Sequence, residues 1–413
     1  LDTMSLDNVR ALMLAYNKSE RFMKIAAQVA DEYIKAGTRD ANWDWRALIE
    51  NNFTTRIYRV RGLHLDDRHT VFTNAAGQQQ AVSATIADMV TYLVNAGPTL
   101  LSQGSTPTLY LPKLQTAQEA AFMARIIDAI EDQMGWERGT VKVFVLIEQL
   151  SEAFQLIEMR AALGKHFVGY NTGRWDYIAS VIKENMWDSS FVPPNFTEMT
   201  MMFPFMKAYE DRVIRVVNTP DINGNKALWI GGMEPQIPVV KGTISETDKN
   251  KAIENAMQIA EVSKLREALG ATQDQLPTIK QIHQLISALP ADVSNLDATQ
   301  LEQVTAAFKQ LGTTTVKAQG TWVAHPGMVD RLRKLLEKLH GTVNRINELG
   351  LLPELQNEKF APLDYSPEAA AKLTELRSGP RTVAEARFLI SVAMQYVNAY
   401  LTGRAAAALK GAD

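Results

Sequence analysis

The stretch VGYNTGRWDYI (Val168–Ile178) joins an apolar run to a helical pattern through a polar break at Asn-Thr-Gly. The apolar run predicts a strand over residues 167–171, and the spacing after the break predicts a helix over residues 175–184. Asp176 follows the break after Arg174 and Trp175, near the point where a parallel strand presents its carboxyl end. The stretch therefore predicts one strand and helix unit, with either a charged turn or a ligand site at the junction.

The same alternation of strand and helix patterns extends over residues 53–326 and is typical of a parallel sheet. An open doubly wound sheet and a (β/α)8 barrel both fit this alternation. Polar residues at the carboxyl ends of several strands favour the barrel. Seven strands are expected, at residues 53–61, 108–112, 140–148, 167–171, 199–203, 227–232 and 320–325. Because closure needs eight strands, the prediction is an α/β protein with an incomplete TIM-type (β/α)8 barrel.

The predicted barrel occupies residues 51–350, between a helical segment at residues 1–50 and another at residues 351–413. Apolar residues at helical spacing predict a helix over residues 116–134 inside the barrel and an amphipathic helix over residues 383–401 in the C-terminal segment. Residues 270–316 contain two short helical patterns and read as an insertion before the last strand, with helix caps expected at Ser294 and Asp297.

The composition of the 413 residues, 46% hydrophobic and 22% charged, is ordinary for a globular protein. The net charge of -3 favours neither nucleic acid nor an anionic membrane as a partner. The absence of Cys excludes disulfides, thiol catalysis and thiolate metal sites. No apolar run reaches the ~18 residues of a membrane span, so a cytoplasmic protein is expected.

Two carboxylates at strand ends carry the main functional prediction. Glu148 closes the run VKVFVLIE, and Asp176 follows the next expected strand. In a parallel barrel both would project from adjacent strands into one mouth, where two hard oxygens suit Mg2+. The alternative is that each acid caps the helix that follows it, which the spacing alone favours.

Other polar residues at strand ends have ordinary structural explanations beside the functional ones. Arg59 and Arg61 share one side of the first expected strand, and an interior arginine calls for an anion or a carboxylate partner. Arg61 could instead point outward, with His64 and His69 in solvent. His325 ends the last strand, where packing against a hydrogen-bond partner is favoured. A glycine pair in IGGMEPQIP permits close approach of a ligand or forms a plain turn.

Taken in order, the motifs RVRGLHL, LYLPKLQTAQEAA, LIEQL, NTGRWDYI, GGMEPQIP and GTWVAHPG resemble the malate synthase family, in its A-type branch. The resemblance implies a (β/α)8 barrel enzyme that condenses acetyl-CoA with glyoxylate. It implies that Glu148 and Asp176 bind Mg2+, and that Arg59 stabilises the enolate oxygen of the acetyl group. It also implies that backbone amides around Gly173, Arg174 and Trp175, freed from the sheet by the break, hold the glyoxylate carboxylate.

The sequence departs from that family in two places. The family's first-strand motif, of the type Ala-Asp-Phe-Glu-Asp, is not found, nor is the C-terminal Met-Glu-Asp-Ala-Ala motif that supplies the proton-abstracting aspartate. Three hypotheses follow. The protein is a malate synthase-like enzyme, or a degenerate relative that serves as a structural or assembly subunit, or a malyl-CoA-type lyase. A homo-oligomer or hetero-oligomer would cover the open barrel edge.

Overall fold

The computed structural model describes residues 56–234, 245–324 and 326–404, together with helical positions 27, 28, 31, 34 and 35. The expected helical segment at residues 1–50, the start of the first strand and His325 therefore lie largely or wholly outside the described residues. The chain divides into two compact units. Unit 1 comprises Leu1–Tyr177 and Arg212–Leu363, and unit 2 comprises Ile178–Asp211 and Asp364–Asp413.

Unit 1 is built on one parallel sheet whose strand order is β1-β4-β5-β6-β7-β8. Its strands are β1 (Ile57–Arg59), β4 (Thr108–Leu111), β5 (Lys142–Ile147), β6 (Phe167–Thr172), β7 (Leu228–Glu234) and β8 (Gly320–Val323). The sheet order follows the chain order, as in a TIM barrel, but within the residues that the structure describes six strands form an open half-barrel. The α/β class and the incompleteness are confirmed, whereas the expected count of seven strands is wrong.

The strand expected at residues 199–203 does not form. A 3-10 helix spans Phe196–Glu198, and α9 (Pro204–Asn218) begins immediately after the apolar run. Proline suits a first helical position because its fixed φ matches the helix and its missing N–H costs nothing there. Met199 and Phe203 are buried, so the run packs without joining the sheet. A short continuous apolar run cannot by itself be assigned to a strand.

One face of the sheet is a small apolar cluster to which all six strands contribute. Tyr110, Phe144 and Leu146 are buried in it, and the partly buried residues Ile57, Val168, Ile230 and Trp322 pack around them. The Tyr110 and Trp322 rings stack with centroids 5.2 Å apart, joining β4 to β8. The carboxyl ends of the strands are thereby held close together.

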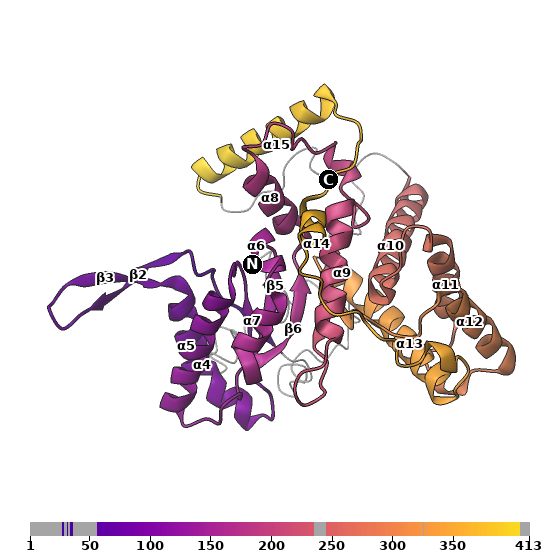
Figure 1. Cartoon of the computed structure of the whole chain (residues 1–413), viewed down its shortest axis with the longest axis horizontal. Coiled ribbons are helices and arrows are strands. Elements are labelled where there is room, and N and C mark those ends of the chain that lie inside the picture. Colours follow the sequence, from indigo (N-terminus) through magenta and orange to yellow (C-terminus); the bar gives the residue numbers. More distant parts are fainter. Residues whose placement is uncertain are drawn as a thin grey trace. The chain divides into compact units, whose positions relative to one another are not determined.

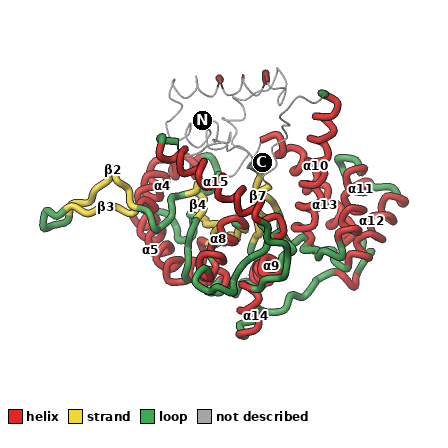
Figure 2. The backbone as a smooth tube through the Cα atoms, turned by 90° about the horizontal axis from the view of Figure 1, so that it is seen from above, coloured by secondary structure: helices red, strands yellow, loops and turns green. Residues whose placement is uncertain are grey.

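The other helices of unit 1 follow their strands. They are α4 (Ala84–Ser102), α5 (Ala117–Met134), α6 (Leu150–Ala153), α7 (Leu156–Leu163), α10 (Glu246–Leu269) and α13 (Val329–Glu348), and α8 (Arg174–Asn185) begins in this unit. The two helical patterns of the expected insertion form α11 (Leu276–Ala288) and α12 (Ala298–Leu311). Figures 1 and 2 show α10 to α13 lying together, and they share a second core that includes Leu265, Ile282, Phe308 and Leu339.

An antiparallel hairpin, β2 (Asp66–Thr73) with β3 (Gln79–Ser83), was not expected from the sequence. It projects from unit 1 as an arm (Figures 1 and 2) and is largely exposed, so it lacks the alternation of apolar and polar residues that marks a half-buried strand. Arg61 anchors its base through Asp67, 2.7 Å away, and Asp88, also 2.7 Å away. Arg61 therefore has the structural role, while His69 lies in β2.

Unit 2 contains α14 (Pro367–Ala371) and α15 (Val383–Leu401), the second with the bounds expected from its pattern. Thr382 caps α15 through the Glu385 amide. Among the described helices, none combines the length and apolar character that crossing a membrane requires.

Removal of the cap of α12 should give a small, local loss of stability. Asp297 accepts a hydrogen bond from the Gln300 amide, and the Gln300 side chain accepts one from the Asp297 amide. We expect Asp297→Ala to lower the free energy of unfolding by about 1 kcal/mol in urea titrations. Glu302→Ala, an exposed position in the same helix, should change it by less than ~0.5 kcal/mol. Equal effects of the two substitutions would contradict the capping role.

The second expected cap, Ser294, lies inside a 3-10 helix capped by Asp292.

Candidate functional site

The candidate site lies where β4, β5 and β6 end. The parallel register pairs Leu111 with Val145 and Ile147 with Thr172, so the residues that follow these strands emerge at the same edge of the sheet. Lys113 follows β4, Glu148 follows β5, and Asp176 lies in the first turn of α8, after β6. The structure thus brings together the two carboxylates expected from the sequence and adds a lysine between them.

Lys113 makes three contacts with these carboxylates. Its Nζ lies 3.0 Å from Glu148 Oε2 and 2.7 Å from Asp176 Oδ1. Its backbone N–H donates to Glu148 Oε1 over 2.8 Å. The backbone at Lys113 is left-handed, with φ of 60°, an unusual conformation for a residue with a side chain. One residue therefore presents an ammonium group and an amide to the same carboxylate.

Glu148 is completely buried, whereas the side chain of Asp176 is about half exposed. Burial raises the pKa of Glu148 to about 7, and the neighbouring Asp176 adds to this, although Lys113 opposes it. Burial also favours the neutral form of Asp176, but hydrogen bonds with Lys113 and Glu148 outweigh it and lower its pKa. The Glu148 amide donates to buried Glu152, 3.0 Å away, which fixes the end of β5. Between the two acids, Glu148 is the one that holds a proton more readily.

Arg59 ends β1 and faces the same group. Its Nη2 lies 3.9 Å from Glu148 Oε2, and its guanidinium lies over the Tyr110 ring, 5.2 Å from the centroid. The side chain is 47% exposed, so the guanidinium is held near the carboxylates while part of it faces solvent. Such a guanidinium can donate hydrogen bonds to an anionic oxygen that enters from solvent.

Gly173 contributes to the site by close packing. A Cβ at this position would lie 2.8 Å from the Cβ of Glu148 and 2.9 Å from Leu146 Cδ1. Its N–H donates to the Ile147 carbonyl over 2.9 Å, so the amide of Gly173 is not freed from the sheet, contrary to expectation. Arg174 and Trp175 form the first turn of α8, with the guanidinium over the indole at 4.5 Å.

The glycine pair of β7 makes room for a side chain. A Cβ on Gly231 would lie 2.4 Å from Glu267 Oε2, and the Gly232 amide donates to Glu267 Oε1 over 2.9 Å. Lys264 pairs with the same carboxylate at 3.0 Å, and both charged side chains are buried. Close approach does occur at this glycine pair, but the approaching group is a carboxylate of α10.

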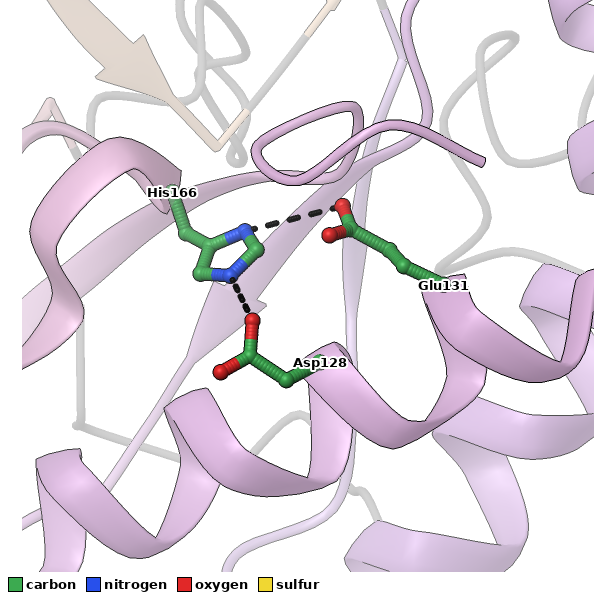
Figure 3. Close-up of side chains that lie close together, drawn as sticks. All are labelled: Asp128, Glu131 and His166. Atoms are coloured by element: carbon green, nitrogen blue, oxygen red, sulfur yellow. Dashed lines mark hydrogen bonds and ion pairs between the residues drawn. The ribbon is translucent and has the colours of Figure 1, made fainter. Parts of the chain in front are cut away.

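A second cluster of possible metal ligands combines Asp128 and Glu131 of α5 with His166 (Figure 3). Their ligand atoms lie within 4.8 Å of one another. The cluster sits at the amino ends of the strands, since His166 directly precedes β6 and the adjoining Val141 directly precedes β5. In barrel enzymes this end generally serves stability, while chemistry occurs at the carboxyl ends.

The contacts of this cluster favour an ion-pair network over a metal site. The His166 ring nitrogens face different acceptors, Val141 O at 2.9 Å and Asp128 Oδ1 at 3.1 Å. Glu131 already accepts the amides of Gly139 and Val141. Arg138 lies 3.2 Å from Asp128 Oδ1 and forms an ion pair with it. A metal ion would therefore have to displace partners from both carboxylates and from the ring.

The Glu148 and Asp176 site fits a hard divalent cation better. It offers two carboxylates, of which Asp176 is about half exposed to solvent, and the Lys113 Nζ already lies between them. Sequence reasoning missed Lys113. The available signal was its position after the strand at residues 108–112, at the same edge as Glu148.

Comparison with known proteins gives one consistent family. A family model described as malate synthase, TIM barrel domain, matches residues 55–273. The chain is 30% identical over 363 residues to malate synthase A of Escherichia coli, covering 88% of this chain and 54% of that protein. It is 30% identical over 345 residues to a bifunctional glyoxylate cycle protein of Caenorhabditis elegans, covering 84% of this chain and 28% of that protein. The chain spans about half the length of several curated relatives that it matches.

Among solved structures, a Haloferax volcanii malate synthase in a ternary complex with pyruvate and acetyl-CoA matches over 79% of this chain and 60% of that one. That match has a TM-score of 0.34 and 13% identity.

Proposed function

The chain belongs to the malate synthase family through its TIM-barrel domain, and on that premise we propose that it condenses acetyl-CoA with glyoxylate and that water then hydrolyses the thioester, giving malate and CoA. The observation that carries the proposal is the convergence of Glu148 and Asp176 on one cation at the carboxyl edge of the sheet. A pair of carboxylates on neighbouring strands of a parallel sheet is suited to Mg2+ and to a substrate that shares it.

Glu148 and Asp176 are the residues that would hold Mg2+. When bound, Mg2+ would supply Lewis-acid polarisation of the glyoxylate carbonyl. The buried Glu148 fixes one side of the site through its bond to the Lys113 amide, while the half-exposed Asp176 leaves the other side open to solvent. We propose that the glyoxylate carboxylate binds at the first turn of α8, near Arg174 and Trp175, because the amino-terminal end of a helix carries a partial positive charge that favours an anion. Gly173 would support them by its close packing against Glu148.

Arg59 would stabilise the negative charge that develops on the acetyl oxygen when the methyl proton is removed. Its position over Tyr110 and 3.9 Å from Glu148 keeps it at the edge of the same site. Preorganised donors of this kind are typically worth about 10^2 to 10^3 in rate. We assign no described residue as the base that removes the proton.

The direct test is CoA release, followed with a thiol reagent, with product identification by mass spectrometry. The proposal expects release that requires acetyl-CoA, glyoxylate and Mg2+ together, with malate as product. No release with glyoxylate or any other α-oxo acid would contradict it. Cleavage of malyl-CoA without net condensation would assign the protein to the lyase alternative.

Loss of the Arg59 side chain should lower CoA release without weakening Mg2+ binding. We expect Arg59→Ala to reduce the rate by about 10^2 to 10^3, because the enolate oxygen loses its donor. The rate of Arg59→Lys should lie between those of the wild type and Arg59→Ala, because lysine keeps the positive charge but lacks the planar guanidinium group. The matched control is Arg125→Ala, an exposed arginine that also lies over an aromatic ring, that of Phe122 at 5.9 Å. Unchanged CoA release in Arg59→Ala would remove Arg59 from the mechanism.

A second candidate, a structural or assembly subunit, is favoured by the open sheet. Within the described residues, β1 and β8 each pair with one neighbouring strand only, so both outer edges lack a strand partner. Unpaired edges commonly associate with other chains. Mass photometry distinguishes the candidates. A stable oligomer without CoA release supports the second, and an active monomer contradicts it.

A further inference from the structure

We propose that Lys113 is a displaceable counter-cation, whose ammonium group lies in the cation position between Glu148 and Asp176 and must leave when Mg2+ binds. The inference rests on the metal site of the proposed function and adds to it a competitor that sets the affinity for the metal. Lys113 is a positioning residue, because it acts on the site through Glu148 and Asp176.

The contacts place the ammonium group where a metal ion would have to lie. Nζ is 3.0 Å from Glu148 Oε2 and 2.7 Å from Asp176 Oδ1, so it bridges both carboxylates. Mg2+ binds carboxylate oxygens at about 2.0–2.1 Å, inside those distances. An ion held by both carboxylates would therefore overlap with the ammonium group and repel it. The two cations exclude each other.

The backbone of Lys113 is fixed while its side chain is able to leave. The Lys113 backbone has a left-handed φ of 60°, and its amide donates a hydrogen bond to Glu148 Oε1 over 2.8 Å. The side chain is 28% exposed, next to an Asp176 side chain that is 53% exposed. Displacement toward solvent needs only rotation of the flexible lysine stem, whereas the amide remains on Glu148.

A competitor of this kind has a measurable consequence. The apparent dissociation constant of a ligand rises as the fraction of protein in the binding-competent state falls. If the ammonium group holds the site in more than nine molecules of ten, its removal should tighten Mg2+ binding by about 10-fold or more. The lysine also offsets the repulsion between the two carboxylates, so its removal should lower the stability of the metal-free protein and increase the stabilisation that Mg2+ gives.

The experiment is isothermal titration of Mg2+ and Mn2+ into the full chain and three variants, with folding checked by circular dichroism. Lys113→Gln removes the cation but keeps the backbone amide. Lys113→Arg keeps a cation and should retain the weak binding of the wild type. Lys142→Gln is the matched control, a lysine at the amino end of β5 whose Nζ bonds to the Lys165 carbonyl. We expect at least about 10-fold tighter binding in Lys113→Gln alone.

Each outcome decides one or both proposals. If the wild type binds Mg2+ and Lys113→Gln binds it more tightly, both the metal site and the displacement of Lys113 are supported. If only Lys113→Gln binds, the lysine has taken the place of the metal, so this inference stands while the Mg2+ dependence of the proposed function fails. If Lys113→Gln binds no more tightly than the wild type, this inference is overturned and the metal site stands. If neither binds, both are overturned.

A labelling measurement on the wild type remains decisive if Lys113→Gln does not fold. Acetylation by an N-hydroxysuccinimide ester, read by mass spectrometry, reports how accessible each amine is. Saturating Mg2+ should increase the labelling of Lys113 at least about two-fold and leave that of Lys142 unchanged, because only the first amine is released. Labelling of Lys113 that is unchanged or reduced in protein that binds Mg2+ would overturn the inference.

Discussion

Replacement of Glu148 with glutamine is expected to weaken Mg2+ binding by roughly 100-fold or more, because even loss of an outer partner of a metal ligand commonly costs about 10- to 100-fold. Glu148 is the buried member of the carboxylate pair. A side chain at the protein surface therefore cannot easily supply the negative charge that the glutamine lacks. The amide is nearly the same size, and its oxygen can still accept the hydrogen bond from the Lys113 amide. The fold should therefore be retained while Mg2+-dependent CoA release falls in parallel with metal affinity.

Isothermal titration and the CoA-release assay check this expectation. The control is Glu158→Gln, which makes the same chemical change at an exposed position in α7. It should behave as the wild type in both measurements. Wild-type Mg2+ affinity in Glu148→Gln would exclude Glu148 as a ligand. The metal site implied by the family resemblance would then be wrong for this chain.

Replacement of Gly169 with alanine is expected to give the largest loss of stability among these substitutions. A Cβ at Gly169 would lie 2.3 Å from the backbone oxygen of Leu228, to which Gly169 is paired in the β6 and β7 register. A backbone atom inside a sheet cannot move aside as a flexible side chain can. We expect the free energy of unfolding to fall by about 3 kcal/mol, at the upper end of overpacking effects.

Gly320→Ala is the matched control for this prediction. Gly320 begins β8 of the same sheet, and a Cβ there meets nothing within 4 Å. Thermal and urea unfolding should give nearly unchanged midpoints for Gly320→Ala and a clearly lower one for Gly169→Ala. Similar midpoints for the two variants would mean that β6 and β7 are not packed as closely as the register requires.

Most of the sheet could be predicted because its signals are local. Six of the seven expected strands form, and the expected helices over residues 116–134 and 383–401 agree with α5 and α15 to within a residue. The error at residues 199–203 arose because a continuous apolar run carries no period, so only its packing and Pro204 decide its structure. The hairpin of β2 and β3 was missed because its strands are exposed and show no regular alternation.

Sequence order also predicted which carboxylates meet, since parallel strands in chain order bring Glu148 and Asp176 to one edge. It could not predict what else reaches that edge. The Gly173 amide was expected to face a ligand, but it bonds to Ile147 within the sheet. The Gly231 position was left open between a ligand and a turn, but it accommodates the Glu267 carboxylate from 36 residues further along the chain.

By itself, the sequence determined the strand and helix alternation, the α/β class and the position of the two acids at strand ends, because each depends on local spacing and chain order. Only the tertiary structure decided that the described sheet has six strands and that Lys113 lies between the two acids. Those features depend on distances between segments that are far apart in the chain. Lys113 is 35 residues from Glu148 and 63 from Asp176, and the pairing of β4 with β5 and of β5 with β6 places its ammonium group within 3.0 Å of both carboxylates.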